Sequence, residues 1–281
     1  PQAIVCSAEA AMQLTIPPEE LMAKRITLKT DSESDIASLT ATLINAGYVS
    51  STQVDGPGQF SVRGGILDVF SPDCENPYRV EFWGDSIDCL STFDPETQRR
   101  IDSTREITIT PASEICCSPD KLTSLIEDFA AKTKGKGSVK VKASLASDIE
   151  KLRGGVVPAN IARYLQLIYP YPATIFDYVD SPLLFVSESF SVKEKANSFY
   201  DLYLEDLKAY LEEGTVCKGL DRHALSFSEL QQIYLDLGVI YLDNIARGSF
   251  DTPVKDLITF NARQLSPWNG SFSVLLDDIH P

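Results

Sequence analysis

Nucleotide chemistry requires a loop that holds phosphates, and the sequence lacks one. Neither GxxxxGKS/T nor GxGxxG occurs in its 281 residues, and these are the glycine-rich loops whose backbone N–H groups bind phosphate oxygens. The acidic pair Asp277-Asp278 follows an apolar run, as do the Mg²⁺ ligands of many nucleotide hydrolases. Without a phosphate loop we interpret this pair as part of a connecting helix. We expect no ATP hydrolysis, no cofactor and no catalytic residue.

Hydrolytic and metal chemistry have little support either. His223 lies beside Asp221, but no GxSxG nucleophile motif accompanies them, so a polar loop is the better interpretation. The cysteines form no CxxC pair and lie mostly far from the two histidines, which is not zinc-site spacing. We expect no metal and six reduced, mostly buried thiols at Cys6, Cys74, Cys89, Cys116, Cys117 and Cys217.

The amino-acid composition restricts the kinds of partner that the chain is expected to bind. The 25 Lys and Arg residues against 40 Asp and Glu give a net charge of -15, which opposes binding to a phosphate backbone. The lysine-rich stretch 132–142 has no interleaved aromatic residues, so we interpret it as a solvated loop. No apolar run approaches the roughly 18 residues that a membrane helix needs. We expect one or two globular domains in the cytoplasm, without a membrane segment.

A surface of arginine and tryptophan is the most informative feature. In a strand over 78–83, side chains alternate between two faces, so Val80 and Phe82 point inward and Arg79, Glu81 and Trp83 point outward. On the preceding strand Phe60 and Val62 point inward, which turns Arg63 outward as well. Tryptophan and arginine are enriched in protein-binding hot spots. The alternative is that Arg79 and Glu81 pair with their neighbours and that Trp83 packs under a loop.

These residues require a small antiparallel sheet to position them. Strands are predicted over 59–70, 78–83 and 86–93, with a tight Gly84-Asp85 turn, and Ile87, Cys89 and Phe93 are expected on one face of the last strand. A helix precedes them. Its apolar residues recur from Ile36 to Ile44, Asp31 or Ser32 can cap it, and Gly47 ends it.

The remaining sequence alternates between helices and short strands, which favours a layered α/β domain. Ser118 and Pro119 mark the start of one helix. Further helices are predicted over 145–152, 160–168, 192–211 and 227–237. Strands are predicted over 3–6, 26–28, 183–186, 239–242 and 257–260.

Three segments carry a resemblance to a known family. Residues 56–70, 78–85 and 93–100 closely resemble the UvrB-like module of bacterial transcription-repair coupling factors, and weaker similarity spans nearly the whole chain. The excision-repair protein UvrB shares this module and is the alternative relative. UvrB usually has RGD where this chain has Arg63-Gly64-Gly65, and it carries an upstream ATP-binding motif and a DNA-clasping hairpin.

The resemblance implies a domain plan. Residues 1–25 and 109–255 would form two parts of a RecA-like layered domain that lacks a nucleotide site. A small, β-rich (α+β) domain that binds UvrA would be inserted between them at 26–108, and 256–281 would connect to a next domain. RNA polymerase and DNA would be reached only through other parts of the parent protein, an ATP-dependent DNA translocase.

The resemblance also implies contact residues for UvrA. They are Arg63, Arg79 and Trp83, the last at a position where the family usually has Phe. The implied function is a non-catalytic UvrA-binding module that recruits nucleotide excision repair to stalled RNA polymerase. We expect replacement of any of the three to weaken UvrA binding and leave thermal stability nearly unchanged, whereas Phe82 should matter for folding.

Overall fold

A computed structural model describes residues 3–135, 137–245, 250, 252–260, 272 and 276. The chain divides into a unit Pro1–Asn244 and a smaller unit Ile245–Pro281. The helices of the first unit are α1 Ala8–Met12, α2 Pro18–Ala23, α3 Ile36–Asn45, α4 Pro119–Lys132, α5 Ser138–Arg153, α6 Leu165–Ile168, α7 Ser189–Glu213 and α8 Phe227–Leu237, with 3₁₀ turns η1 Ile161–Tyr164 and η2 Ile175–Tyr178. Its strands are β1 Ile26–Lys29, β2 Val49–Ser50, β3 Gln59–Arg63, β4 Ile66–Val69, β5 Tyr78–Trp83, β6 Ser86–Phe93, β7 Arg100–Thr104, β8 Glu106–Ile109, β9 Leu184–Ser187 and β10 Val239–Leu242.

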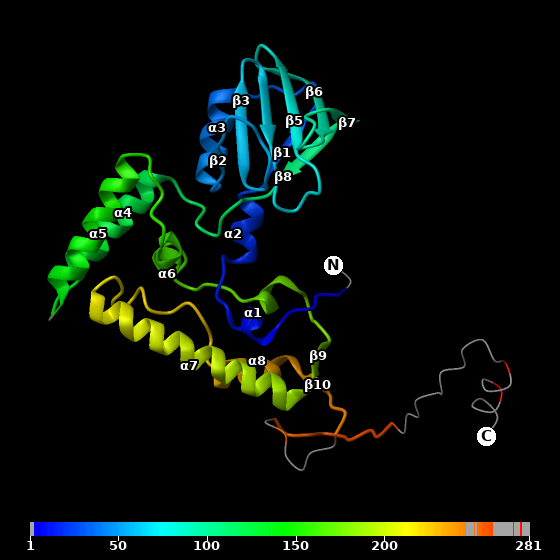
Figure 1. The fold of residues 1–281 in the computed structure, drawn as a ribbon, viewed down its shortest axis with the longest axis vertical. Helices are drawn as coiled ribbons and strands as arrows, with labels where there is room; N and C mark the ends of the chain where they lie inside the picture. Colours follow the sequence, from blue (N-terminus) through cyan, green and yellow to red (C-terminus); the bar gives the residue numbers. More distant parts are fainter. Residues whose placement is uncertain are drawn as a thin grey trace. The chain divides into compact units, whose positions relative to one another are not determined.

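A six-stranded sheet in the order β2-β3-β4-β5-β6-β7 forms the centre of the module that carries the predicted surface (Figure 1). All neighbours are antiparallel except β2 and β3. Helix α3 packs on one face of the sheet, where Leu39 and Leu43 meet buried residues such as Leu67, Val80 and Leu90. The predicted strands 78–83 and 86–93 are confirmed at both ends.

Helix α3 is confirmed, but its predicted cap is wrong. The Asp35 carboxylate accepts a hydrogen bond from the backbone N–H of Ser38 at 2.8 Å, which makes Asp35 the N-cap. Asp31 instead has φ 64°, a left-handed conformation that a residue at a turn can adopt. Gly47 follows the helix at φ 87°, and an added Cβ would lie 2.2 Å from the Cβ of Ser113. Glycine is therefore required there by both backbone conformation and space.

A bulge in β6 overturns one predicted face. The pairing of β5 with β6 shifts between Glu81 and Phe82, so Asp88 is an extra residue in the ladder. Because of this extra residue, Ile87 lies in the core under α3, whereas Phe93 belongs to a separate buried cluster with Val54 and Phe70. Alternation alone had placed Ile87, Cys89 and Phe93 together.

The edge of the sheet explains a second difference. Phe60 is buried as predicted, but Val62 is exposed. Strand β2 pairs only with Gln59 and Phe60, so Val62 lies on a part of β3 with no neighbour on that side. Phe82 packs against the core cluster, although it is only half-buried.

Most helices outside the sheet contribute side chains to a second apolar core, which includes Met12, Ile126 and Leu145. Figure 1 shows these helices as α1 and α4 to α8. Helix α4 begins as predicted, since the Ser118 hydroxyl accepts from the N–H of Lys121 and Pro119 is the first helical residue. Helix α8 is confirmed over its full length, and α7 contains the predicted 192–211 segment. The lysine-rich stretch is not simply a loop, because Lys132 ends α4 while Lys140 and Lys142 belong to α5.

Two predicted strands are wrong. Residues 3–6 and 257–260 form no strand among the described residues, and apolar side chains such as Val5 and Phe260 are exposed. A short apolar run becomes a strand only where another strand pairs with it. By contrast, 26–28 lies within β1, which pairs with β8, and the segments at 183–186 and 239–242 meet as the parallel pair β9–β10.

The mixed α/β class is confirmed. Within the described residues, parallel pairing outside the six-stranded sheet is limited to β9 and β10, and half of the residues of β10 are exposed rather than buried. The RecA-like arrangement therefore stays a prediction, as do the domain boundaries.

Candidate protein-binding surface

A row of polar residues crosses the sheet on the face opposite α3. The register places Ser61 opposite Asp68, Asp68 opposite Arg79, and Arg79 opposite Ser91. Ser61, Asp68 and Ser91 are buried. A buried carboxylate requires a charged partner and hydrogen bonds, and here both come from arginines.

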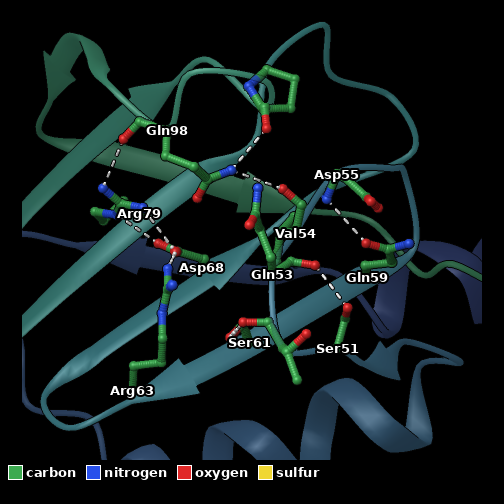
Figure 2. A network of polar contacts seen from close by, with 12 residues as sticks. Ser51, Gln53, Val54, Asp55, Gln59, Ser61, Arg63, Asp68, Arg79 and Gln98 are labelled. Atoms are coloured by element: carbon green, nitrogen blue, oxygen red, sulfur yellow. Dashed lines mark hydrogen bonds and ion pairs between the residues drawn. The ribbon is translucent and has the colours of Figure 1, made fainter.

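Two guanidinium groups converge on Asp68 (Figure 2). Arg79 donates from Nε to Oδ1 at 2.7 Å and from Nη2 to Oδ2 at 2.9 Å, a bidentate pair across neighbouring strands. Arg63 donates from Nη2 to Oδ2 at 2.7 Å. The hydrogen bond to Asp68 raises the pKa of Arg79 above its ordinary value, so the pair favours the charged form of the guanidinium.

The chain folds back over the Arg79 end of this row. The Arg79 guanidinium lies 4.4 Å from the centre of the Phe93 ring, and its Nη1 donates to the carbonyl of Gln98 at 3.3 Å. Gln98 in turn donates from Nε2 to the carbonyls of Pro95 at 2.8 Å and Val54 at 3.3 Å. The segments 51–55 and 94–98 therefore lie over the sheet, as Figure 2 shows.

The 94–98 segment has its own support. The Asp94 carboxylate accepts from the backbone N–H of Thr97 at 2.6 Å and from that of Glu96 at 3.1 Å. The backbone hydrogen bond from Thr97 is the main reason why the pKa of Asp94 is lowered. A closed turn of this kind holds the Gln98 carbonyl at Arg79.

The neighbouring row of the same face is open to solvent. The register aligns Arg63, Ile66, Glu81 and Cys89 across four strands, and the last three are half-buried. Glu81 pairs with Arg100 of β7. Trp83 stands at the end of β5 with 85% of its surface exposed.

The Arg63-Gly64-Gly65 motif shapes the hairpin that presents Arg63. Gly64 has φ 60°, which a hairpin turn requires. At Gly65 an added Cβ would lie 3.1 Å from the carbonyl oxygen of Phe82. The backbone N–H of Phe82 donates to the Gly65 carbonyl at 2.7 Å. Gly64 therefore allows the turn conformation, and Gly65 allows the turn to lie against β5.

The three residues predicted from the sequence share this face but differ in access. The side chain of Arg63 is 50% exposed and Trp83 is almost fully exposed, whereas the side chain of Arg79 is only 17% exposed. The alternative considered from the sequence is therefore correct for Arg79 and Glu81, which pair with neighbours. It is wrong for Trp83, which no loop of the described residues covers. Alternation identifies the face of a strand but not what folds over it.

Sequence reasoning missed Asp68, the residue that joins the two arginines. A signal was present, because an acid between Leu67 and Val69 in a buried strand needs a basic partner. Pairing the β4 and β5 strands residue by residue would have identified Arg79 as that partner.

Other candidate residues form no site among the residues that the structure describes. The His223 ring lies 3.0 Å from the Leu220 carbonyl, and Arg222 pairs with Glu229. No group of three or more His, Cys, Asp or Glu residues within the described ranges could hold a metal ion. The described helices include none that is both long and apolar enough to span a membrane. Asp277 and Asp278 lie outside the described residues.

Comparison with known proteins gives a consistent result. The UvrB interaction domain family matches residues 26–115. The transcription-repair-coupling factor of Bacillus subtilis is 28% identical over 98% of this chain, and that of Myxococcus xanthus is 27% identical over 82%. A Staphylococcus epidermidis protein of the same name is 23% identical over 89%. The chain spans only 20 to 24% of the length of these three relatives. The resemblance to bacterial transcription-repair-coupling factors is therefore confirmed over most of the chain, and residues 26–115 are similar to the UvrB interaction domain family.

Proposed function

We propose that the face carrying Arg63, Arg79 and Trp83 binds UvrA, and that the chain is the non-catalytic UvrA-binding module of a transcription-repair coupling factor. In this role it recruits nucleotide excision repair to stalled RNA polymerase. The observation that carries the proposal is the placement of two arginines on one buried carboxylate beside a fully presented tryptophan. Arginine and tryptophan anchors of this kind dominate binding energy at protein interfaces.

The three residues have different tasks in this proposal. Trp83 supplies the apolar anchor, since its indole is exposed at the end of β5 and gains most from burial in a partner pocket. Arg63 supplies charge, because within the described chain only its Nη2 donates a hydrogen bond, to Asp68. A guanidinium with donors to spare suits a carboxylate of the partner. Arg79 acts mainly indirectly, because it holds the Asp68 carboxylate to which Arg63 also donates.

The comparisons support the role in repair coupling. The family that matches residues 26–115 is named for UvrB, but the relatives that align with most of this chain are transcription-repair-coupling factors. This favours a coupling factor over a UvrB fragment. Contacts with RNA polymerase and DNA would belong to other parts of the parent protein.

Isothermal titration calorimetry of the chain against UvrA tests the proposal. Arg63→Ala and Trp83→Ala should each weaken binding by about 2 kcal/mol or more, because truncation of a hot-spot anchor leaves its partner groups unpaired or its pocket empty. The melting temperature of both variants should stay close to that of the wild type.

Matched controls separate this surface from general effects. Arg105→Ala removes an exposed arginine after β7, and Tyr171→Ala removes an aromatic side chain with 90% exposure elsewhere in the chain. Both should bind UvrA like the wild type. Absence of binding by the wild-type chain, or equal affinity of all five proteins, would contradict the proposal.

A further inference from the structure

The Asp68 carboxylate occupies an unusual place, since it is 1% exposed yet contacts a half-exposed arginine. Among the described residues its Oδ1 accepts from Arg79 alone, whereas its Oδ2 accepts from both Arg79 and Arg63. One carboxylate oxygen thus joins a guanidinium inside the protein to a guanidinium at the surface.

Arg79 fixes the position of this carboxylate. Its guanidinium has both hydrogen bonds of a bidentate pair, stacks on Phe93 and donates to the Gln98 carbonyl. With so many contacts Arg79 has little rotamer freedom left, and Asp68 shares its rigidity. The Oδ2 atom is therefore a fixed anchor point for the Arg63 side chain.

Arg63 has no comparable support of its own. It ends β3 at the hairpin turn, and within the described chain its guanidinium is held by Asp68 alone. A free arginine side chain loses much of its rotamer freedom when a partner immobilises it. Prior placement by Asp68 lowers this cost, which is how preorganisation raises affinity.

The charges of the cluster also support a binding role for Arg63. Two guanidinium groups and one carboxylate leave a net charge of one positive unit, and the exposed part of it lies on Arg63. Asp68 also separates two like charges that would otherwise repel each other. The arrangement leaves Arg63 oriented, charged and able to bind one carboxylate.

We propose that Asp68 is a positioning residue of this surface, which holds the Arg63 guanidinium in the orientation that a carboxylate of UvrA meets. The proposal rests on the proposed function. It assigns Asp68 an effect on affinity that passes through Arg63, without any contact between Asp68 and the partner.

Calorimetry with UvrA tests it in a double-mutant cycle. Asp68→Asn keeps the shape of the side chain and should lower affinity about tenfold or more. The double variant Asp68→Asn, Arg63→Ala should bind within about twofold of Arg63→Ala, because residues that act as one unit are not additive. Asp88→Asn makes the same charge change at an exposed β6 residue and should bind like the wild type.

Arg63→Lys provides a second variant that leaves the buried carboxylate in place, so the test survives even if Asp68→Asn does not fold. Lysine keeps the charge but cannot form the fixed fork, so it should lose nearly as much affinity as Arg63→Ala. Additive losses in the cycle, tighter binding by Asp68→Asn, or wild-type affinity of Arg63→Lys would overturn the assignment. If the wild-type chain does not bind UvrA, the proposed function itself fails, which is a different outcome.

Discussion

Two buried carboxylates, Asp68 in the sheet and Asp148 among the helices, are each held by an arginine. Arg79 pairs with Asp68 and stacks on Phe93, while Arg163 pairs with Asp148 at 2.8 Å and stacks 4.8 Å from the centre of the Tyr164 ring. Each cluster thus combines a buried aspartate, an arginine and an aromatic ring, so residue types alone would suggest the same role for both.

Their surroundings differ. The Arg163 side chain is 6% exposed, and it also donates to Tyr164, to Ser144 and to the backbone carbonyl of Thr215. The Tyr164 hydroxyl donates to Asp148 at 2.9 Å, and burial raises its pKa. These contacts join α5 to η1 and to the segment after α7, so they serve the fold.

The sheet cluster contains a second arginine, Arg63, whose side chain is half-exposed, and the helical cluster has no second arginine among the described residues. Lys151 also reaches Asp148, but at 3.5 Å and within the same helix. The comparison shows that a buried arginine–carboxylate pair is no mark of a binding site. Both carboxylates contact a half-exposed cation, but Asp68 holds an arginine of a neighbouring strand at 2.7 Å, whereas Lys151 belongs to the same helix as Asp148 and is farther from it.

The largest effect is expected at Asp148. Asp148→Ala leaves the Arg163 charge buried without its carboxylate, and loss of one partner of a buried pair costs about 3–5 kcal/mol of folding free energy. UvrA affinity of the folded protein should not change. Urea denaturation measures the first quantity and calorimetry below the melting temperature measures the second.

The exposed pair Glu127–Arg153 gives the control, because Glu127→Ala should cost less than about 1 kcal/mol. Weaker UvrA binding by folded Asp148→Ala would contradict the assignment of a purely structural role to the Asp148 cluster.

Arg79 should show an intermediate, mixed effect. Arg79→Ala leaves Asp68 with one half-exposed partner, so we expect a loss of about 1–3 kcal/mol of folding free energy together with weaker UvrA binding. This revises the expectation from the sequence that stability would barely change, because the structure encloses Arg79. Paired denaturation and calorimetry on Arg79→Ala and Arg63→Ala measure it. Equal stability of the two variants would show that Arg79 is as loosely held as Arg63.

The smallest effect concerns pH. Burial lowers the pKa of His223 below its ordinary value of 6.5, outweighing the Leu220 carbonyl and the Asp221 charge, which raise it. Protonation therefore favours the unfolded state, so this contribution to stability is complete above pH 6.5 and is lost as the pH falls through the lowered value.

Folding free energy should thus decline between pH 7 and 5, and the decline should shrink in His223→Gln. The same slope in both proteins would assign the effect to other titratable groups.

Much of the fold follows from local signals in the sequence. The strands 78–83 and 86–93 and the helix 227–237 are predicted at both ends, because their signals, such as alternation and the Gly84 turn, act within a few residues. The structure adds a Ser226–Glu229 capping box at the start of that helix. The segments at 3–6 and 257–260 are equally apolar, but no strand within the described part of the chain pairs with them. Local pattern does not reveal the presence of a partner.

The two-residue repeat of the strands was enough to place Arg63, Arg79 and Trp83 on one face of the sheet. The roles of these residues depend on tertiary contacts. Register brought Asp68 opposite Arg79, and the 94–98 segment enclosed Arg79 while Arg63 and Trp83 stayed open. The physical reason is that side-chain alternation is a property of one strand, whereas burial and ion pairing depend on segments that lie far apart in the chain.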